Sequence, residues 1–176
     1  MRNFTLCLSV LILAVSFSSA IGKERKKMSE LKITSPAFVT NGYIPARFTC
    51  DGTDINPPLE IAHLPDETKS LALIVDDPDA PVGMWVHWVV WNIDPATREI
   101  AEDSVPRAAT QGKNDWKRNG YGGPCPPSGV HRYFFKLYAL DTRFNLGAGT
   151  TKSDLEKAME GHILAKSELI GLYKRR

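Results

Sequence analysis

Short runs of β-branched and aromatic residues follow one another along the chain from Leu31 onward, separated by Gly, Pro, Asn and Asp. Runs of this length and composition are typical of β-strands, and the turn formers at their ends set their limits. The predicted strands cover residues 31–34, 43–49, 59–61, 70–76, 84–93, 132–141 and 165–173. Because no long helices alternate with them, the pattern favours an antiparallel sandwich or barrel over a parallel α/β sheet.

Two of these runs differ in how their apolar residues alternate. Residues 84–93 are apolar on both faces, which indicates a central strand covered on both sides, and His87 is its polar interruption. In residues 132–141 the odd positions from Tyr133 onward are apolar, whereas Arg132 and Lys136 point to the other face. By the same alternation, His131 and Tyr133 are expected on the buried face.

One helix is predicted near the C-terminus. Ser153-Asp154-Leu155-Glu156 has the form of a capping box, in which the Ser hydroxyl and the Glu carboxylate accept hydrogen bonds from free N–H groups of the first turn. Apolar residues then recur at helical spacing from Leu155 to Ile163, with Gly161 as the expected end of the helix.

The N-terminus has the pattern of an export signal. Arg2 precedes an apolar run over residues 4–17, and Ser18-Ser19-Ala20 supplies the small residues that a signal peptidase reads. The run is shorter than the ~20 apolar residues of a membrane-spanning helix, which favours cleavage after Ala20 over anchoring. We therefore expect a signal peptide at residues 1–20, a flexible stub at 21–29 and a single domain at 30–176. The mature protein is then periplasmic or secreted, without stable membrane insertion.

The composition fits one folded domain with no nucleic-acid partner. The chain has 176 residues and a formal charge of +2, from 22 basic and 20 acidic residues. A chain of this length can bury a sizeable core. The basic residues are scattered, apart from short clusters at residues 23–27 and 174–176, so no basic stripe points to a nucleic acid.

Removal of residues 1–20 would leave two cysteines, Cys50 and Cys125, each in a Gly- and Pro-rich segment. In an oxidising compartment they either form a disulfide or remain free thiols near one rim, and the sequence does not give the separation that decides between the two. A zinc site is not expected, because the chain has no CxxC pair and its four histidines are widely spaced. No other cofactor is predicted.

Three segments place polar groups next to apolar strands. Asp77-Pro78-Asp79-Ala80-Pro81 follows one strand, His87-Trp88 lies in the next, and the Gly- and Pro-rich residues 122–127 lead to His131-Arg132-Tyr133. Each has an ordinary structural explanation, as a turn, as a buried histidine with a core partner, or as a rigid connector. Taken singly, none of the segments indicates a function.

Together and in this order, the three segments resemble the phosphatidylethanolamine-binding protein family, and specifically its prokaryotic Raf-kinase-inhibitor-like branch. Residues 48–52, 56–59, 114–116 and 161–171 fit the same family, so the resemblance extends over essentially the whole chain after residue 20. It implies a mainly β fold, an antiparallel β-sandwich with a few short helices. It also implies a small pocket at one rim that takes phosphate-like and carboxylate-like anions.

The resemblance also implies which residues form this pocket and its Pro-rich lip. They are Asp77, Asp79, His87, Cys125, Pro126, Pro127, His131 and Tyr133. Imidazole N–H, tyrosine O–H and loop N–H groups are donors, and donors that converge in a partly desolvated cavity hold an anion. Asp77 has two alternative roles there, to orient a histidine and keep it charged, or to bind an ammonium group. Asp79 has the same alternatives or simply holds the turn.

Two departures from the mammalian members of that family lead us to expect a smaller or more open pocket. Val82-Gly83-Met84 stands where they carry a tyrosine and charged residues, and the chain ends at Arg176 where they continue into a helix that covers the site. The resemblance further implies a non-trans peptide in the pocket wall, for which Ala80–Pro81 is the better candidate.

The sequence therefore predicts a non-enzymatic protein that binds phosphate, a phosphomonoester or a phospholipid head group and modulates a protein partner such as a kinase or a protease. One alternative is an acid–base or metal-assisted hydrolase that uses the Asp and His cluster. Against it, the chain has no nucleophile elbow, no HExxH helix and no GKS or GKT phosphate loop. The other alternative is a protein-binding inhibitor with a vestigial pocket.

Overall fold

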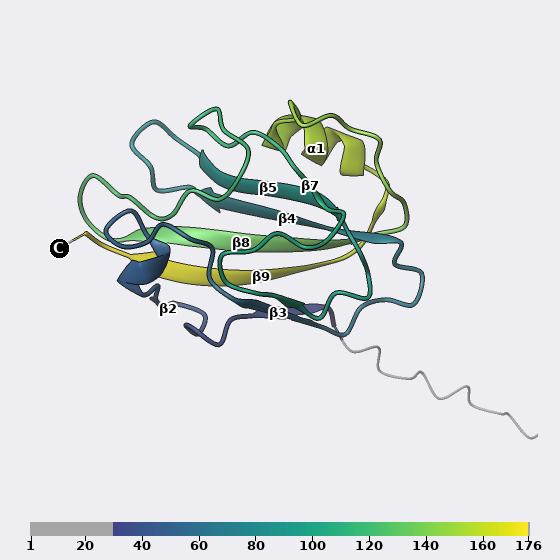
Figure 1. The fold of residues 1–176 in the computed structure, drawn as a ribbon, viewed down its shortest axis with the longest axis horizontal. Helices are drawn as coiled ribbons and strands as arrows, with labels where there is room; N and C mark the ends of the chain where they lie inside the picture. Colours follow the sequence, from purple (N-terminus) through teal and green to yellow (C-terminus); the bar gives the residue numbers. More distant parts are fainter. Residues whose placement is uncertain (1–29, 176) are drawn as a thin grey trace, which may run out of the picture.

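The structure, a computed structural model, describes residues 30–175 and consists mainly of β-strands (Figure 1). Its elements are β1 (Lys32–Thr34), β2 (Gly42–Tyr43), the 3-10 helix η1 (Ala46–Phe48), β3 (Leu59–Ala62), β4 (Ser70–Asp77), β5 (Trp85–Ile93), β6 (Glu99–Ile100), β7 (Thr110–Gln111), β8 (His131–Leu140), α1 (Lys152–Met159) and β9 (Ile163–Tyr173). The predicted signal peptide and stub lie outside the described residues. Between residues 30 and 175, no helix is long and apolar enough to cross a membrane.

The strands form two sheets. The large sheet has the order β2-β9-β8-β4-β5-β7, and the small sheet has the order β1-β3-β6. Neighbouring strands are antiparallel, except that the short β2 runs parallel to β9. The predicted mainly β sandwich is therefore confirmed, with one parallel pairing at its edge.

The main core lies between the two sheets. Ile33 of β1 and Leu59 of β3 pack in one buried cluster with Leu73 of β4 and Phe135 of β8. Burial of such side chains stabilises the fold by about 1.5–3 kcal/mol each. The small sheet thus covers one face of the large sheet.

The helix α1 covers part of the other face of the large sheet (Figure 1). Its Leu155 and Met159 are buried and pack in a second cluster with Ile74 of β4 and Trp91 of β5. Both helix residues belong to the apolar face that the sequence predicted, and β4 and β5 contribute side chains to both clusters. These two strands are therefore covered on both sides.

Alternation along the central strands decides which side chains reach each face. All eight residues of β4 are buried, and β5 is buried at most positions, as predicted for a central strand. On β8 the odd positions from His131 to Ala139 are buried while Arg132 is exposed, which confirms the predicted alternation. His131 and Tyr133 consequently lie on the face that the small sheet covers.

A β-bulge in β5 directs His87 to the same face. Val75 of β4 pairs with Trp88 and the next residue, Asp76, pairs with Val86, so His87 is the additional residue in β5. Bulges turn a side chain away from the regular alternation. The ring of His87 therefore lies 5.1 Å from the ring of Tyr133, centroid to centroid, on the face to which Trp88 also points.

Three predicted element boundaries were wrong. The strand expected over residues 43–49 ends at Tyr43, and Ala46–Phe48 forms the helix η1 instead. Pro45 precedes this helix with a φ of −58°, and its ring and missing N–H suit a helix start better than a strand interior.

The helix α1 is capped by Thr151 rather than by Ser153. Thr151 Oγ1 accepts a hydrogen bond from the N–H of Asp154, and the Asp154 carboxylate accepts one from the N–H of Thr151. Thr151 and Asp154 have the same spacing as Ser153 and Glu156, and both pairs fit a capping box. The chain uses the earlier pair, and the final strand also begins earlier than predicted, at Ile163.

Asp76 and Asp77 at the end of β4 point to opposite faces of the large sheet, because side chains alternate along a strand. Asp76 is 0% exposed and lies between Lys136 of β8 and Lys152 of α1, with N–O distances of 2.8 and 2.7 Å. This buried ion group joins α1 to the sheet. Asp77 is left on the face that carries His87, His131 and Tyr133.

We predict that Asp76→Asn lowers the free energy of unfolding by about 3–5 kcal/mol, because two lysines then lie next to each other without their counter-ion. Urea unfolding measures the loss. Glu102→Gln is the control: Glu102 pairs with Arg47 at 2.7 Å on the surface, where an ion pair contributes less than about 1 kcal/mol. Similar small losses in both variants would show that the buried group does not stabilise the fold.

Candidate functional site

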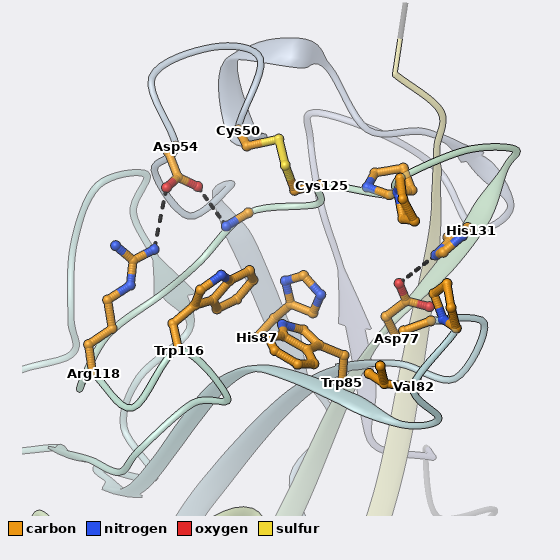
Figure 2. Close-up of a pocket in the computed structure, with 15 residues that line it drawn as sticks. Cys50, Asp54, Asp77, Val82, Trp85, His87, Trp116, Arg118, Cys125 and His131 are labelled. Atoms are coloured by element: carbon orange, nitrogen blue, oxygen red, sulfur yellow. Dashed lines mark hydrogen bonds and ion pairs between the residues drawn. A yellow bond between two sulfur atoms is a disulfide. The ribbon is translucent and has the colours of Figure 1, made fainter.

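A cavity of about 320 Å³ lies where the ends of β4, β5 and β8 meet three loops (Figure 2). Asp77 ends β4, Trp85 begins β5, and His131 begins β8. Six of the eight predicted site residues line the cavity, namely Asp77, His87, Cys125, Pro126, Pro127 and His131. The three predicted segments, far apart in the sequence, are therefore brought together at one rim of the sandwich.

Asp77 holds His131 in a fixed orientation. The Nδ1 of His131 lies 2.7 Å from Asp77 Oδ2, and both side chains are almost fully buried. Since a carboxylate only accepts, Nδ1 is the donor, and Nε2 is the ring nitrogen that is left for a ligand. The other carboxylate oxygen, Oδ1, accepts a hydrogen bond from the N–H of Asp79 at 2.8 Å. Both oxygens of Asp77 are thus engaged within the protein.

His87 is fixed by the loop on the other side of the cavity. Its Nδ1 lies 2.6 Å from the carbonyl oxygen of Gly122, whose own N–H donates to the carbonyl of His87 at 3.0 Å. A carbonyl only accepts, so Nδ1 carries the proton and Nε2 of the neutral ring is an acceptor. Burial lowers the pKa of His87, and the bond to Gly122 and the charge of Asp77 offset this only in part.

Tyr133 lies behind the His87 ring rather than on the cavity wall. The two rings meet edge to face, and Tyr133 is 1% exposed. Its hydroxyl is buried close to the Asp77 carboxylate, in a geometry short of a full hydrogen bond. Burial, and then the negative charge of Asp77 and its contact with the hydroxyl, raise the pKa of Tyr133 well above its usual value. The hydroxyl is therefore a protonated donor next to the site, with Asp77 as its neighbouring acceptor.

Asp79 takes the third of its predicted roles and holds the turn. Its carboxylate accepts hydrogen bonds from the backbone N–H of Arg132 at 3.0 Å and from the guanidinium at 2.8 and 2.7 Å. These bonds lower the pKa of Asp79 to about 2. Asp79 does not line the cavity, and it fixes the loop after β4 to the start of β8.

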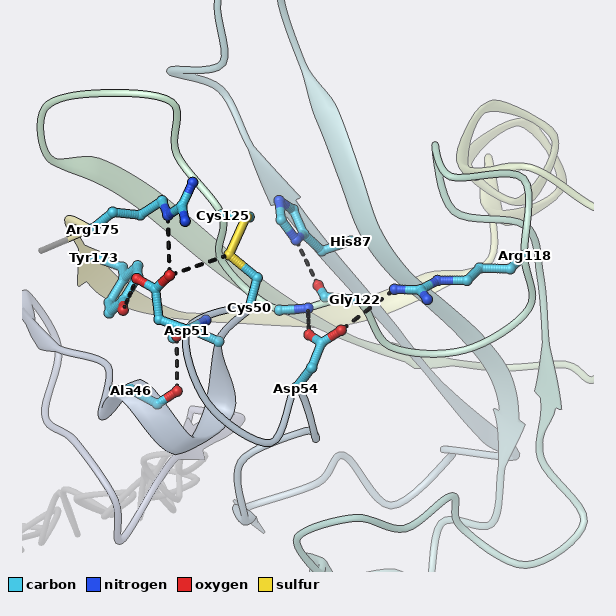
Figure 3. The surroundings of a disulfide bond; sticks show 12 residues. Ala46, Cys50, Asp51, Asp54, His87, Arg118, Gly122, Cys125, Tyr173 and Arg175 are labelled. Atoms are coloured by element: carbon cyan, nitrogen blue, oxygen red, sulfur yellow. Dashed lines mark hydrogen bonds and ion pairs between the residues drawn. A yellow bond between two sulfur atoms is a disulfide. The ribbon is translucent and has the colours of Figure 1, made fainter.

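The lip of the cavity is closed by a disulfide between Cys50 and Cys125 (Figure 3). The structure thus selects the disulfide over the two free thiols that the sequence left open. Next to it, Asp54 Oδ1 accepts a hydrogen bond from the N–H of Gly123 at 2.6 Å, and the N–H of Cys50 donates to the carbonyl of Pro124. The loop after η1 is therefore tied to the Pro-rich loop at three neighbouring points.

Several residues of the cavity were not predicted as site residues, among them Asp54, Trp85, Trp116 and Arg118. The indoles of Trp85 and Trp116 meet edge to face at 5.3 Å, and Trp116 also meets the His87 ring at 5.1 Å. The Arg118 guanidinium lies over the Trp116 ring and 3.6 Å from Asp54 Oδ2. One sequence feature pointed to Trp116: Asn114-Asp115-Trp116 fits the family resemblance, but it was assigned no role in the pocket.

The expected non-trans peptide at Ala80–Pro81 is wrong, because the peptide bonds of residues 30–175 are all trans. Ala80, Pro81 and Val82 nevertheless line the cavity. Among the described residues, no group of three or more His, Cys, Asp and Glu side chains is arranged to hold a metal ion.

Comparisons with family models, with curated proteins and with solved structures all point to the same family. The family model for phosphatidylethanolamine-binding protein matches residues 34–174. A UPF0098 protein of Pyrococcus horikoshii is 52% identical over 164 residues, which cover 89% of this chain and 82% of that protein. A UPF0098 protein of Methanothermobacter thermautotrophicus is 52% identical over 150 residues, which cover 82% of this chain and 99% of that protein.

Two solved structures share the fold. The crystal structure of a phosphatidylethanolamine-binding protein homologue from Chlamydia trachomatis has a TM-score of 0.81 at 43% identity and covers 84% of this chain and 99% of that chain. The Escherichia coli protein YbcL, described as a member of the mammalian family, has a TM-score of 0.79 at 30% identity and covers 84% of this chain and 100% of that chain.

We predict that thiol titration of the denatured protein, isolated without reductant, rises by two thiols per chain after reduction. Because the bond closes a long loop, with a sequence separation of 75, its loss should lower the free energy of unfolding by about 4 kcal/mol. The double variant Cys50→Ser, Cys125→Ser is the control and should not respond to reductant. Equal thiol numbers before and after reduction would contradict the disulfide.

Proposed function

Because the chain belongs to the phosphatidylethanolamine-binding protein family, we propose that it is a binding protein for a small anion, held in the cavity by His87 and His131 with the Tyr133 hydroxyl behind the His87 ring. The observation that carries this proposal is that His87 and His131 both line the cavity with Nδ1 engaged within the protein, which leaves Nε2 of each ring for a ligand. The Tyr133 hydroxyl is buried behind the His87 ring, close to the Asp77 carboxylate. An anion next to the His87 ring would offer this hydroxyl a second acceptor.

The histidines, when protonated, add two donors for such a ligand. Both Nδ1 atoms are engaged within the protein, so each ring offers Nε2 to the cavity. No residue between 30 and 175 forms a hydrogen bond with either Nε2 atom. Inorganic phosphate, a phosphomonoester and a phospholipid head group all present the acceptor oxygens that this set requires.

Binding through His87 is coupled to proton uptake. The neutral ring has a lone pair on Nε2 and only the protonated ring can donate there, while burial lowers the pKa of His87 in the free protein. An anion that binds the protonated ring must therefore raise the pKa of His87 in the complex. Affinity is consequently highest below the pKa of the free protein and falls as the pH rises towards the pKa of the complex.

The geometry of Asp77 favours the orienting role over the ammonium-binding role. Its two oxygens already accept hydrogen bonds from Asp79 and His131. An ammonium group at this carboxylate would compete with both bonds. Asp77 instead fixes which nitrogen of His131 faces the ligand, as second-layer carboxylates do for histidines in other binding sites.

The lining of the cavity supports binding over covalent catalysis. Among the described residues that form its wall there is no serine or threonine, and both cysteines are joined in the disulfide. A hydroxyl or free thiol nucleophile with an adjacent base, which acyl transfer through a serine, threonine or cysteine intermediate would need, is not among these side chains. The Asp77–His131 pair therefore serves to position a ligand.

We predict that Tyr133→Phe weakens the binding of sulfate by about 0.5–1.5 kcal/mol, or about two- to tenfold, because one donor is lost without a change of shape. Isothermal titration calorimetry measures the affinity, and sulfate keeps a fixed charge across the histidine range. Tyr138→Phe is the matched control, since Tyr138 lies on the same strand but packs on the face that α1 covers.

An unchanged affinity in Tyr133→Phe would place the anion elsewhere. An absence of sulfate binding in the unsubstituted protein at pH 5 as well as at pH 7 would contradict the proposed function. That result would leave protein-partner binding as the role of this surface.

A further inference from the structure

We propose that the ligand of this cavity is an organic anion with an aromatic ring, and that the ring packs against Trp85 and Trp116. This inference rests on the proposed function and narrows it from any small anion to an aryl anion. Three features carry it: the size of the cavity, the arrangement of the indoles and the engagement of both acidic side chains.

The cavity is larger than an inorganic anion requires. A water molecule occupies roughly 30 Å³ of liquid, so a cavity of about 320 Å³ corresponds to about ten waters. Much of its wall is apolar and includes Ala80, Pro81, Val82, Pro126 and Pro127. A phosphate or sulfate at the histidines would leave this apolar wall in contact with water.

The indoles of Trp85 and Trp116 are arranged to receive a further ring. They meet edge to face at an interplanar angle of 83°. In Figure 2 Trp116 lies to one side of the His87 ring, Trp85 lies below it, and the Asp77–His131 pair lies on the other side. Trp116 is 40% exposed, so part of its indole is uncovered at the mouth of the cavity. Edge-to-face and offset aromatic contacts contribute beyond the burial of area.

The charges of the cavity disfavour an ammonium group at this aromatic end. Asp54 accepts the N–H of Gly123 and faces Arg118, whose guanidinium lies 5.5 Å from the centre of the Trp116 ring. Arg118 is the one lysine or arginine among the described residues that line the cavity. A positive charge already stacks on the indole, and both oxygens of Asp77 are engaged. An uncharged ring fits this end better than a cationic head group.

The experiment compares benzenesulfonate with methanesulfonate by calorimetry, because the two ligands have the same head group and the same fixed charge. We expect benzenesulfonate to bind at least about tenfold more tightly, from the buried area of its ring and from its contacts with the indoles. Cyclohexanesulfonate, which has an apolar but non-aromatic ring, should bind less tightly than benzenesulfonate. Phosphoethanolamine should gain nothing over inorganic phosphate.

Trp116→Leu should remove most of the preference for benzenesulfonate over methanesulfonate, and the ratio of the two affinities is the readout. Urea unfolding reports separately that the variant is folded. Tyr43→Leu is the matched control, since Tyr43 is an exposed aromatic residue that does not line the cavity and should leave the preference unchanged.

The outcomes separate this inference from the proposed function. Suppose that sulfate and methanesulfonate bind, but that benzenesulfonate binds no more tightly than methanesulfonate or no more tightly than cyclohexanesulfonate. The aryl inference is then wrong and the anion site stands. A preference that survives Trp116→Leu likewise overturns the inference. If none of the sulfonates, sulfate or phosphate binds, the proposed function itself fails.

Discussion

The hydrogen bond between His87 Nδ1 and the carbonyl of Gly122 determines what the cavity can bind, because it fixes the tautomer of the ring that faces the ligand. Two local features make this bond. The bulge in β5 turns His87 out of the regular alternation, and Gly122 lets the loop approach, since a Cβ there would lie 2.6 Å from the Trp116 indole. With Nδ1 occupied, only protonation converts Nε2 into a donor, so the proposed binding of an anion at Nε2 would take up a proton.

The loops around the cavity are held by bonds that do not involve a ligand. The Cys50–Cys125 disulfide and the Asp54 carboxylate join the loop after η1 to the Pro-rich lip, and Asp51 accepts a hydrogen bond from the hydroxyl of Tyr173 at the end of β9. Asp79 joins the loop after β4 to Arg132 in the same way. Ordering these loops in advance reduces the entropy that a ligand must offset on binding.

The regular parts of this architecture follow from the sequence, whereas the parts set by loops do not. Alternation along residues 132–141 places His131 and Tyr133 on the buried face, as the structure shows. The bulge at His87 could not be predicted, because residues 84–93 are apolar on both faces and an extra residue does not disturb that pattern. The start of α1 could not be predicted either, because two pairs of residues with capping-box spacing lie next to each other. Asp54 and Arg118 reach the cavity from loops whose path depends on tertiary contacts, so sequence spacing could not bring them together.

The most direct test is nuclear magnetic resonance of the imidazole nitrogens, with and without sulfate, across the pH range in which histidines titrate. We expect free His87 to carry its proton on Nδ1, with a pKa below the usual value, and saturating sulfate to protonate Nε2 and raise that pKa. The nitrogen signals of His162, which is exposed and pairs with Asp141, should not change when sulfate is added. An unprotonated Nε2 and an unchanged pKa of His87 in the presence of bound sulfate would contradict the proposed coupling of anion binding to proton uptake.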